Sequence, residues 1–272
     1  MMKPTTATTA NAYDAFYRDF DSPLMQRVRR EAYGEDIGQH SWVTADEVRA
    51  DIERLALTRS SRLIDLGCGP CGPLTFVLNA VGCDGVGVDQ SSAALRVGHS
   101  RAAALGVDSR LTTREADLNE ALAFDDASFD ATISLDVVLH LRDRARLFAE
   151  VARVLRPSGR FLFTDAGVVT GPVSGDEVAA RSAYGYTQFA PLGLNDRLLE
   201  QTGFAVVETE DRTASVVRNA GGRLEAVRAH RAELECSIGD RAVKQQERYL
   251  TMLVTLAQRR AVSRWMYLAE KR

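Results

Sequence analysis

Residues 62–72, RLIDLGCGPCG, decide the fold that this sequence predicts. An apolar run ends in an acid and is followed by a loop that carries Gly67, Gly69 and Gly72. Pro73 comes next, and proline is well tolerated at the first position of a helix. Glycines let the backbone approach a ligand closely, and the amides at a helix N-terminus favour polar or anionic groups. We therefore expect a buried strand, a tight ligand-binding turn and the start of a helix.

Further strand and helix patterns alternate along the chain after this loop. The expected strands cover residues 84–88, 110–115, 128–135, 160–165, 204–209 and 265–269. Helical spacing or capping residues mark residues 91–105, 142–155, 192–203 and most of 213–262. Repeated β-α units with short turns are typical of a parallel sheet with helices on both faces.

Acidic residues stand at or just after the ends of the first five expected strands: Asp65, Asp89, Asp117, Asp136 and Asp165. Parallel strands bring their carboxyl ends to one edge, where open α/β sheets bind ligands. The spacing from the glycine loop to Asp89, roughly 20 residues, suits a carboxylate that binds ribose hydroxyls. A single strand-end acid can be a cap or a solvated turn residue, but the run of five predicts a site.

The composition excludes some classes of function. The 272 residues are 45% hydrophobic and 26% charged, and the formal net charge of −3 argues against a nucleic-acid partner held by a basic field. No apolar run approaches the roughly 20 residues that span a bilayer. Residues 1–14 are polar and rich in Thr and Ala, so we expect a disordered lead-in rather than a signal peptide. These features predict a cytoplasmic protein without a membrane partner.

The cysteines fit a reduced cytoplasmic protein. Cys68 and Cys71 form a C-x-x-C motif, which metal and redox sites also use. No second Cys or His pair stands at a zinc-ligand spacing, so we expect no metal. We interpret the two cysteines as small loop residues that pack beside a ligand.

The pattern resembles the class I methyltransferases that use S-adenosylmethionine. The segments that carry the resemblance are DLGCGPCG at 65–72, Asp89 after VGV, Asp117-Leu118, ISLDVVLHL at 133–141 and LRPSGRFLFTD at 155–165. It implies an α/β, Rossmann-like fold with a seven-stranded, mostly parallel sheet, helices on both faces and a helical cap. WMYLAEKR at 265–272 would be its antiparallel last strand. The implied cofactor is S-adenosylmethionine, with S-adenosylhomocysteine as product and no metal.

One residue departs from the usual G-x-G-x-G loop of that family. Cys71 takes the third glycine position, and Gly72 follows it. The thiol adds bulk where backbone and cofactor meet, and we expect it to be accommodated if Cys71 keeps a negative φ.

The resemblance also implies a division of the chain, as a monomer or homodimer that acts on a small molecule. Residues 1–45 would cover the cofactor. The core would comprise residues 46–166, 193–211 and 263–272, and the substrate-binding cap residues 167–192 and 212–262.

The implied cofactor contacts follow the family pattern residue by residue. Gly67 and Gly69 would pass beneath the methionyl part, and Asp65 would reach its ammonium group. Asp89 would accept from both ribose hydroxyls, and Asp117 would meet the adenine amino group. The other residues expected near the cofactor are Cys68, Gln90, Leu118, Ser134, Gln39 and His40.

Shorter segments resemble narrower groups within the class. The segments at residues 32–40, 135–141 and 184–189 look like those of the phosphoethanolamine and sarcosine/dimethylglycine-type amine methyltransferases. Bacterial sugar O-methyltransferases share much of the same layout. In the phosphoethanolamine group an Asp and a His four residues apart form a catalytic pair, which Asp136 and His140 match.

The chemistry of methyl transfer requires an acceptor with a free lone pair. An ammonium or hydroxyl must lose its proton before or during attack, and His140 has a suitable intrinsic pKa, about 6.5, for a general base. Asp136 would orient the imidazole if the segment between them turns helically. Packing of His140 on the cofactor, and capping by Asp136, are the structural alternatives.

Aromatic and acidic residues suggest the acceptor. Tyr33 and Tyr186 correspond to tyrosines that close the site in the amine methyltransferases, Tyr17 is a looser match, and Asp165 is a second candidate anchor. Aromatic clusters favour methylated amines through cation–π contacts, so an amine nitrogen is the leading hypothesis. Tyr184 stands where that group has a phosphate-binding basic residue, which argues against a phosphorylated amine.

Three other functions are alternatives to methylation of an amine nitrogen. O-methylation of a sugar or natural-product hydroxyl would use His140 in the same way. A non-catalytic cofactor-binding protein is less consistent with an intact set of polar residues. A dinucleotide dehydrogenase is disfavoured because GCGPCG is not G-x-G-x-x-G and the strand-end acids would repel a pyrophosphate.

Overall fold

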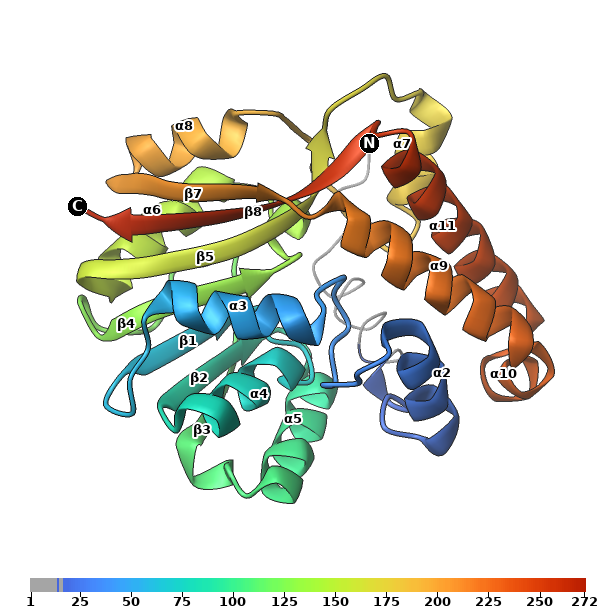
Figure 1. Ribbon diagram of the computed structural model, residues 1–272, viewed down its shortest axis with the longest axis horizontal. Helices are drawn as coiled ribbons and strands as arrows, with labels where there is room; N and C mark the ends of the chain where they lie inside the picture. The colour runs from blue at the N-terminus through green and yellow to red at the C-terminus, as the bar shows by residue number, and fades with distance from the viewer. Residues whose placement is uncertain (1–13, 15–16) are drawn as a thin grey trace.

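A computed structural model describes Asp14 and residues 17–272. The expected disordered lead-in over residues 1–14 therefore lies, except for Asp14, outside the described residues. A mixed sheet runs through the described chain, with helices against both of its faces (Figure 1). The strands are β1 (Arg62–Leu66), β2 (Asp84–Asp89), β3 (Leu111–Glu115), β4 (Phe129–Leu135), β5 (Leu155–Val169), β6 (Ala190–Pro191), β7 (Phe204–Asp211) and β8 (Val262–Lys271).

The sheet has the order β3-β2-β1-β4-β5-β8-β7, and the two-residue β6 pairs with β5 off this path. Strands β1 to β5 pair in parallel, whereas β8 pairs antiparallel with both β5 and β7. The Rossmann-like fold and the antiparallel last strand predicted from the sequence are confirmed. The parallel strands place the carboxyl ends of β1, β2 and β4 at one edge.

Ten helices are present in the described residues. They are α2 (Pro23–Tyr33), α3 (Ala45–Leu55), α4 (Gly72–Val81), α5 (Ser92–Leu105), α6 (Arg144–Val154), α7 (Gly175–Arg181), α8 (Leu194–Gln201), α9 (Thr213–Ala229), α10 (Arg231–Ile238) and α11 (Asp240–Gln258). None of these is long and apolar enough to cross a bilayer.

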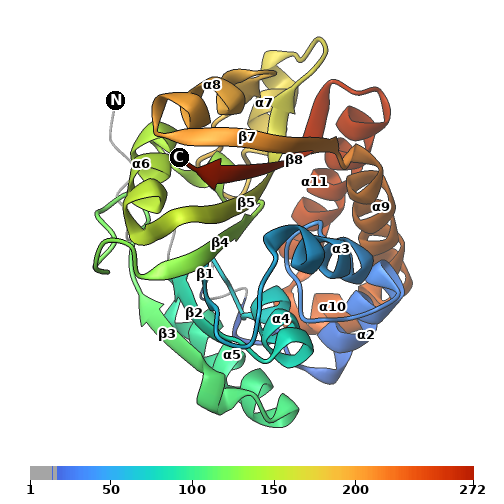
Figure 2. The ribbon, with the colours of Figure 1, turned by 60° about the vertical axis from the view of Figure 1, so that its left-hand side comes forward.

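Alternating residues of the central strands bury the two faces of the sheet. Leu63 packs with α3, α4 and α5, whereas its neighbour Ile64 packs with α6 and α8 on the opposite face. Successive side chains of a strand point to opposite faces, so a strand buried on both sides is apolar without interruption. Figure 2 shows the two helical layers on either side of the sheet.

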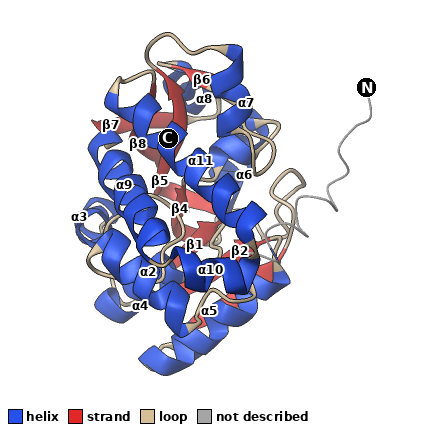
Figure 3. Cartoon of the chain, turned by 90° about the vertical axis from the view of Figure 1, so that its right-hand side faces the viewer, coloured by secondary structure: helices blue, strands red, loops and turns tan. Residues whose placement is uncertain are grey.

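Helices α2, α9, α10 and α11 form a separate layer, which we call the helical cap (Figure 3). Its apolar core includes Leu224 from α9 and Leu250 from α11, and it joins the rest of the molecule through Trp42 and Ala166. The cap therefore packs against the loop before α3 and the end of β5, beside the edge where the strands finish.

The segment 167–192, expected as a loop, contains more regular structure than the sequence pattern indicated. Strand β5 continues to Val169, and α7 begins at a capping box in which Ser174 and Glu177 bond to each other's backbone amides. An S-x-x-E pattern is a recognised helix-start signal, and it outweighs the glycines around it here.

Candidate active site

A pocket of about 280 Å³ opens at the carboxyl ends of the parallel strands. The glycine loop and strand-end acids form one half, and residues of α9, α11 and the segment after α7 form the other. The structure brings together thirteen of the residues that the sequence singled out. They are Tyr17, His40, Asp65, Gly67, Cys68, Gly69, Asp89, Gln90, Asp117, Leu118, Asp136, His140 and Tyr186.

The glycine loop leaves no room for side chains on the cavity side. Gly67 and Gly69 have φ values of 79° and 51°, in the left-handed region that favours glycine. A Cβ on Gly67 would lie 2.4 Å from Cγ2 of Val137, and one on Gly69 would lie 3.0 Å from the Tyr17 hydroxyl. The loop thus brings its backbone directly against whatever occupies the pocket.

Three carboxylates face the pocket from the ends of the first three strands. Burial, and then the neighbouring charge of Asp89, raise the pKa of Asp65 to about 8. Asp89 accepts hydrogen bonds from the amides of Gly69 (2.8 Å) and Ser91 (2.9 Å), which fix its position. Oδ1 of Asp117 accepts from the side-chain amide of Asn119 (2.8 Å). An ionised carboxylate has about four lone-pair sites, so each retains acceptor capacity for a donor-rich ligand.

Comparison with known proteins identifies this arrangement. Residues 64–163 match the methyltransferase domain family. The structure of a putative sarcosine dimethylglycine methyltransferase from Galdieria sulphuraria superimposes with a TM-score of 0.80 at 20% identity, covering 97% of this chain and 98% of that one. The chain contains a methyltransferase domain over residues 64–163.

Two further relatives show the range of acceptors among proteins similar to this methyltransferase. A 27-O-demethylrifamycin SV methyltransferase from Amycolatopsis mediterranei is 31% identical over 190 residues, and the chain spans 66% of that relative's length. A phosphoethanolamine N-methyltransferase 2 from Haemonchus contortus, in complex with phosphomonomethylethanolamine and S-adenosylhomocysteine, has a TM-score of 0.77 at 22% identity. That match covers 94% of this chain and 60% of the other.

Cys71 is accommodated although the condition expected for it, a negative φ, is not met. Cys71 has a φ of 54°, and its thiol points into the core, with Sγ 3.5 Å from Sγ of Cys68. Space for the thiol comes from two glycines, because a Cβ on Gly98 would lie 2.7 Å from the Cys71 sulfur and one on Gly87 3.1 Å from it. The methyltransferase thus keeps the loop's left-handed turn without the usual glycine.

This packing predicts that a glycine-to-alanine substitution in α5 destabilises the protein. Gly98→Ala is expected to lower the free energy of unfolding by about 1–3 kcal/mol, because the new methyl would overlap the Cys71 sulfur. The double variant Cys71→Gly/Gly98→Ala should recover most of the loss, as measured by urea unfolding. As a control, Gly221→Ala on α9 meets open space and should stabilise by about 0.5–1 kcal/mol. An equal gain at Gly98 would contradict the prediction.

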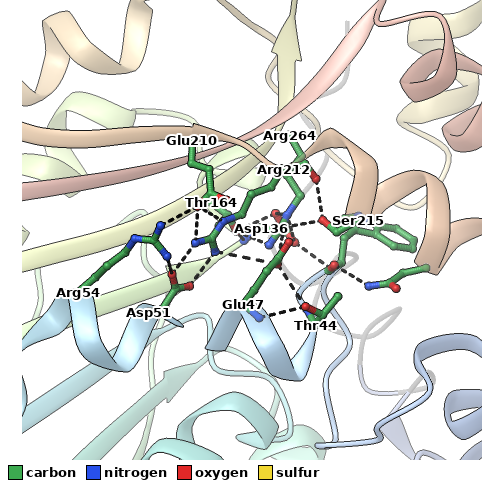
Figure 4. A network of polar contacts seen from close by, with 12 residues as sticks. Thr44, Glu47, Asp51, Arg54, Asp136, Thr164, Glu210, Arg212, Ser215 and Arg264 are labelled. Atoms are coloured by element: carbon green, nitrogen blue, oxygen red, sulfur yellow. Dashed lines mark hydrogen bonds and ion pairs between the residues drawn. The ribbon is translucent and has the colours of Figure 1, made fainter. Parts of the chain in front are cut away.

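The Asp136 carboxylate is bound by residues from three parts of the chain, two of which Figure 4 labels. Nε of Arg264 donates to Oδ1 (2.8 Å), and the Thr164 hydroxyl donates to the same oxygen (2.8 Å). The amide of Trp42 donates to Oδ2 (2.9 Å). Asp136 lines the pocket, but its position is set by this buried network, which holds the loop before α3 against the end of β4.

His140 has a different partner from the one that the sequence suggested. Its Nδ1 lies 2.9 Å from the carbonyl oxygen of Tyr186, and no hydrogen bond joins it to Asp136 within the described part of the chain. Asp136 has a left-handed φ of 61°, so the segment does not turn helically from Asp136 to His140. The expected Asp136–His140 pair is therefore not formed.

The tautomer of His140 follows from this contact. A carbonyl oxygen can only accept, so Nδ1 carries the proton and Nε2 keeps its lone pair in the neutral ring. Burial lowers the pKa of His140 from its ordinary value, against the opposing effect of the Tyr186 carbonyl. The ring is accordingly neutral at physiological pH.

Two predicted substrate residues do not reach the pocket. Tyr33 is buried and donates to the carbonyl of Ser41 (3.1 Å). Asp165 is fully buried, with Arg144 and Asn195 on one oxygen and the Gly167 amide on the other (2.8 Å). Local partners thus engage the polar atoms that were expected to meet the substrate, and both residues lie outside the pocket lining.

Two predicted cofactor residues also lie outside the pocket lining. Gln39 is fully buried, accepts from the amide of Ile37 (2.9 Å) and donates to the carbonyl of Glu35 (3.1 Å). Ser134 donates to the carbonyl of Leu66 (2.9 Å) and ties β4 to β1. Both side chains stabilise backbone turns and strands that carry the site.

The cap and α7 contribute pocket residues that sequence reasoning missed. Arg181, Arg223, Gln246 and Tyr249 line the pocket from α7, α9 and α11. The chain has 34 Lys and Arg residues, and nothing in the local sequence separates these two arginines from exposed ones. Only the packing of the cap onto the strand ends selects them.

Proposed function

We propose that this chain binds S-adenosylmethionine in the strand-end half of the pocket and methylates a hydroxyl group of a small molecule held beneath the cap. The observation that carries the proposal is His140, whose Nδ1 faces a carbonyl and whose Nε2 is left to accept a proton. We assign residues 167–192 and 212–262 to binding of the acceptor. Residues 1–45 are assigned to covering the cofactor.

The strand-end half fits the cofactor by the chemistry of its residues. The loop's glycines make a cradle that a Cβ would fill, beside three carboxylates that can accept from ammonium, hydroxyl and amino groups. We assign the ammonium to Asp65, the ribose hydroxyls to Asp89 and the adenine amino group to Asp117. When bound, S-adenosylmethionine supplies an electrophilic methyl group.

The residues around the acceptor have separate roles in the proposal. His140 removes the hydroxyl proton through Nε2, and the Tyr186 carbonyl holds the ring in the required tautomer. Asp136 is bound by Arg264 and acts as a positioning residue for the loop that carries His40 and Trp42. Closure of the cap excludes water from the reacting groups.

An amine nitrogen, the hypothesis that the sequence favoured, is the second candidate. Three tyrosines of the cap side, Tyr184, Tyr186 and Tyr249, line the pocket and could contact a cationic amine. Asp165 and Tyr33, the two anchors expected for such a cation, lie outside the pocket lining. Two arginines, Arg181 on α7 and Arg223 on α9, line the pocket. A hydroxyl acceptor is therefore the better supported of the two.

The test combines binding and turnover. Calorimetric titration with S-adenosylhomocysteine measures cofactor affinity, and methyl-labelled S-adenosylmethionine is then incubated with pooled hydroxyl compounds and pooled amines. Label on oxygen, followed by mass spectrometry, is the expected result. Label on nitrogen alone would show that the acceptor is an amine and not a hydroxyl compound. Failure to bind S-adenosylhomocysteine would overturn the proposal.

The raised pKa of Asp65 predicts a pH-dependent cofactor affinity. Below about pH 8 the free protein holds this carboxyl protonated, so ionising it to pair with the ligand ammonium weakens binding. The Kd for S-adenosylhomocysteine should fall by up to about tenfold per pH unit between pH 6.5 and 8. In Asp65→Asn this dependence should vanish, whereas Asp125→Asn, an exposed control, should retain it. A pH-independent wild type would contradict the assignment.

A further inference from the structure

Two buried arginines of the pocket differ from every other buried arginine in the described chain. Six arginines are buried: Arg29, Arg144, Arg181, Arg212, Arg223 and Arg264. Four of them form ion pairs with a carboxylate at 4.0 Å or less. Arg181 and Arg223, which are 3% and 8% exposed, form none with any residue that the structure describes. Both line the pocket.

Arg181 is only partly satisfied by protein partners. One terminal nitrogen donates to the hydroxyl of Tyr249 (2.8 Å), and Nε is buried and makes no hydrogen bond within the described residues. Leaving a buried charged donor unsatisfied is costly, and native proteins rarely do so without a reason. An anionic group in the pocket that Arg181 lines would compensate the charge of this guanidinium.

Arg223 reaches the same half of the pocket from α9. Its guanidinium carbon lies 5.6 Å from the centroid of the Trp42 ring, and its charge opposes the effect of burial on the pKa of Tyr184. The charge of Arg181 in turn acts on the imidazole of His140. The two cations thus stand close to the residues assigned to the acceptor, one on α7 and one on α9.

The carboxylates that line the pocket do not neutralise these arginines. Asp136 is engaged by Arg264, and Asp65, Asp89 and Asp117 lie in the half assigned to the cofactor. A buried charge without a counter-ion is strongly unfavourable, so the counter-ion must come from what binds there.

We propose that the methyl acceptor carries an oxyanion, a carboxylate or phosphate, which Arg181 and Arg223 bind beneath the cap while its hydroxyl faces His140. This inference rests on the proposed function, because it names the acceptor class of that same site. Planar guanidinium groups bind such oxyanions in bidentate geometry, which would also orient the acceptor toward the methyl group.

Binding of small probes tests this inference without knowledge of the natural acceptor. The protein saturated with S-adenosylhomocysteine is titrated with benzoate, phenyl phosphate, benzamide and benzylamine. Benzoate or phenyl phosphate should bind at least about tenfold more tightly than benzamide, and the stronger of the two identifies the kind of oxyanion. Arg181→Gln and Arg223→Gln should each remove most of this preference.

Controls separate this inference from the proposed function and from misfolding. Arg218→Gln, an exposed arginine on α9, should keep the preference, and Arg181→Lys should retain part of it. Each variant's affinity for S-adenosylhomocysteine reports on folding and on the cofactor site. Equal binding of benzoate and benzamide, or tighter binding of benzylamine, overturns the oxyanion. Loss of S-adenosylhomocysteine binding by the wild type counts instead against the proposed function.

Discussion

His140→Ala is expected to lower kcat/KM for methyl transfer by about 10²–10⁴-fold, with little change in the Kd for S-adenosylhomocysteine. The loss follows because Nε2 is the base in the proposal, and alanine leaves no group in its place. Steady-state rates with a hydroxyl acceptor from the labelling pools, together with calorimetric cofactor titration, measure the two quantities. His99→Ala, an exposed histidine on α5, should leave both unchanged.

The pH profile gives a second readout of the same role. Burial lowers the pKa of His140, so the ring should be mostly neutral at pH 7 and the wild-type kcat should change little above that pH. As pH falls through that lowered pKa the imidazolium forms and kcat should decline. The His140→Ala variant should lack this acidic limb. An unchanged profile in the variant would show that His140 packs beside the cofactor without moving a proton.

The fold was predictable because its signals are local and repeated. Apolar runs and apolar residues at helical spacing mark the strands and helices, and glycines and acids mark the turns at the strand ends. The rule of right-handed crossovers then places those strand ends at one edge of the sheet. Residues 212–262 were predicted as a helical, substrate-binding cap, but its packing against Trp42 and Ala166 was not, because it depends on contacts far apart in sequence.

The site was predictable to a lesser extent, for a physical reason. The strand-end acids look equivalent in the sequence, yet Arg144 binds Asp165 and Arg264 binds Asp136. The partner of Asp136 lies 128 residues away along the chain. Whether a carboxylate meets a ligand or an arginine is decided by such distant pairings, which no local pattern reports. No local pattern reports either that Arg181 and Arg223 lack a carboxylate partner within the described chain.

Arg264→Met is expected to lower the free energy of unfolding by about 3–5 kcal/mol. Arg264 is fully buried and donates both to Asp136 and, through Nη1, to Glu47 on α3 (2.8 Å). Methionine fills a similar volume but leaves the buried Asp136 without its cation, and within the described chain Glu47 keeps only Arg212 as a cationic partner, at 4.0 Å. Urea unfolding at pH 7 measures the loss. Arg260→Met removes an ion pair whose arginine is 65% exposed, and it should cost less than about 1 kcal/mol.

A double variant distinguishes electrostatics from packing. If the loss in Arg264→Met comes from the uncompensated charge of Asp136, Asp136→Asn/Arg264→Met should recover part of it, because that charge is gone. A loss that is additive in the double variant would indicate packing instead. Since the amide of Trp42 also binds Asp136, the electrostatic case further predicts weaker S-adenosylhomocysteine binding in Arg264→Met, through loosening of the loop that carries His40.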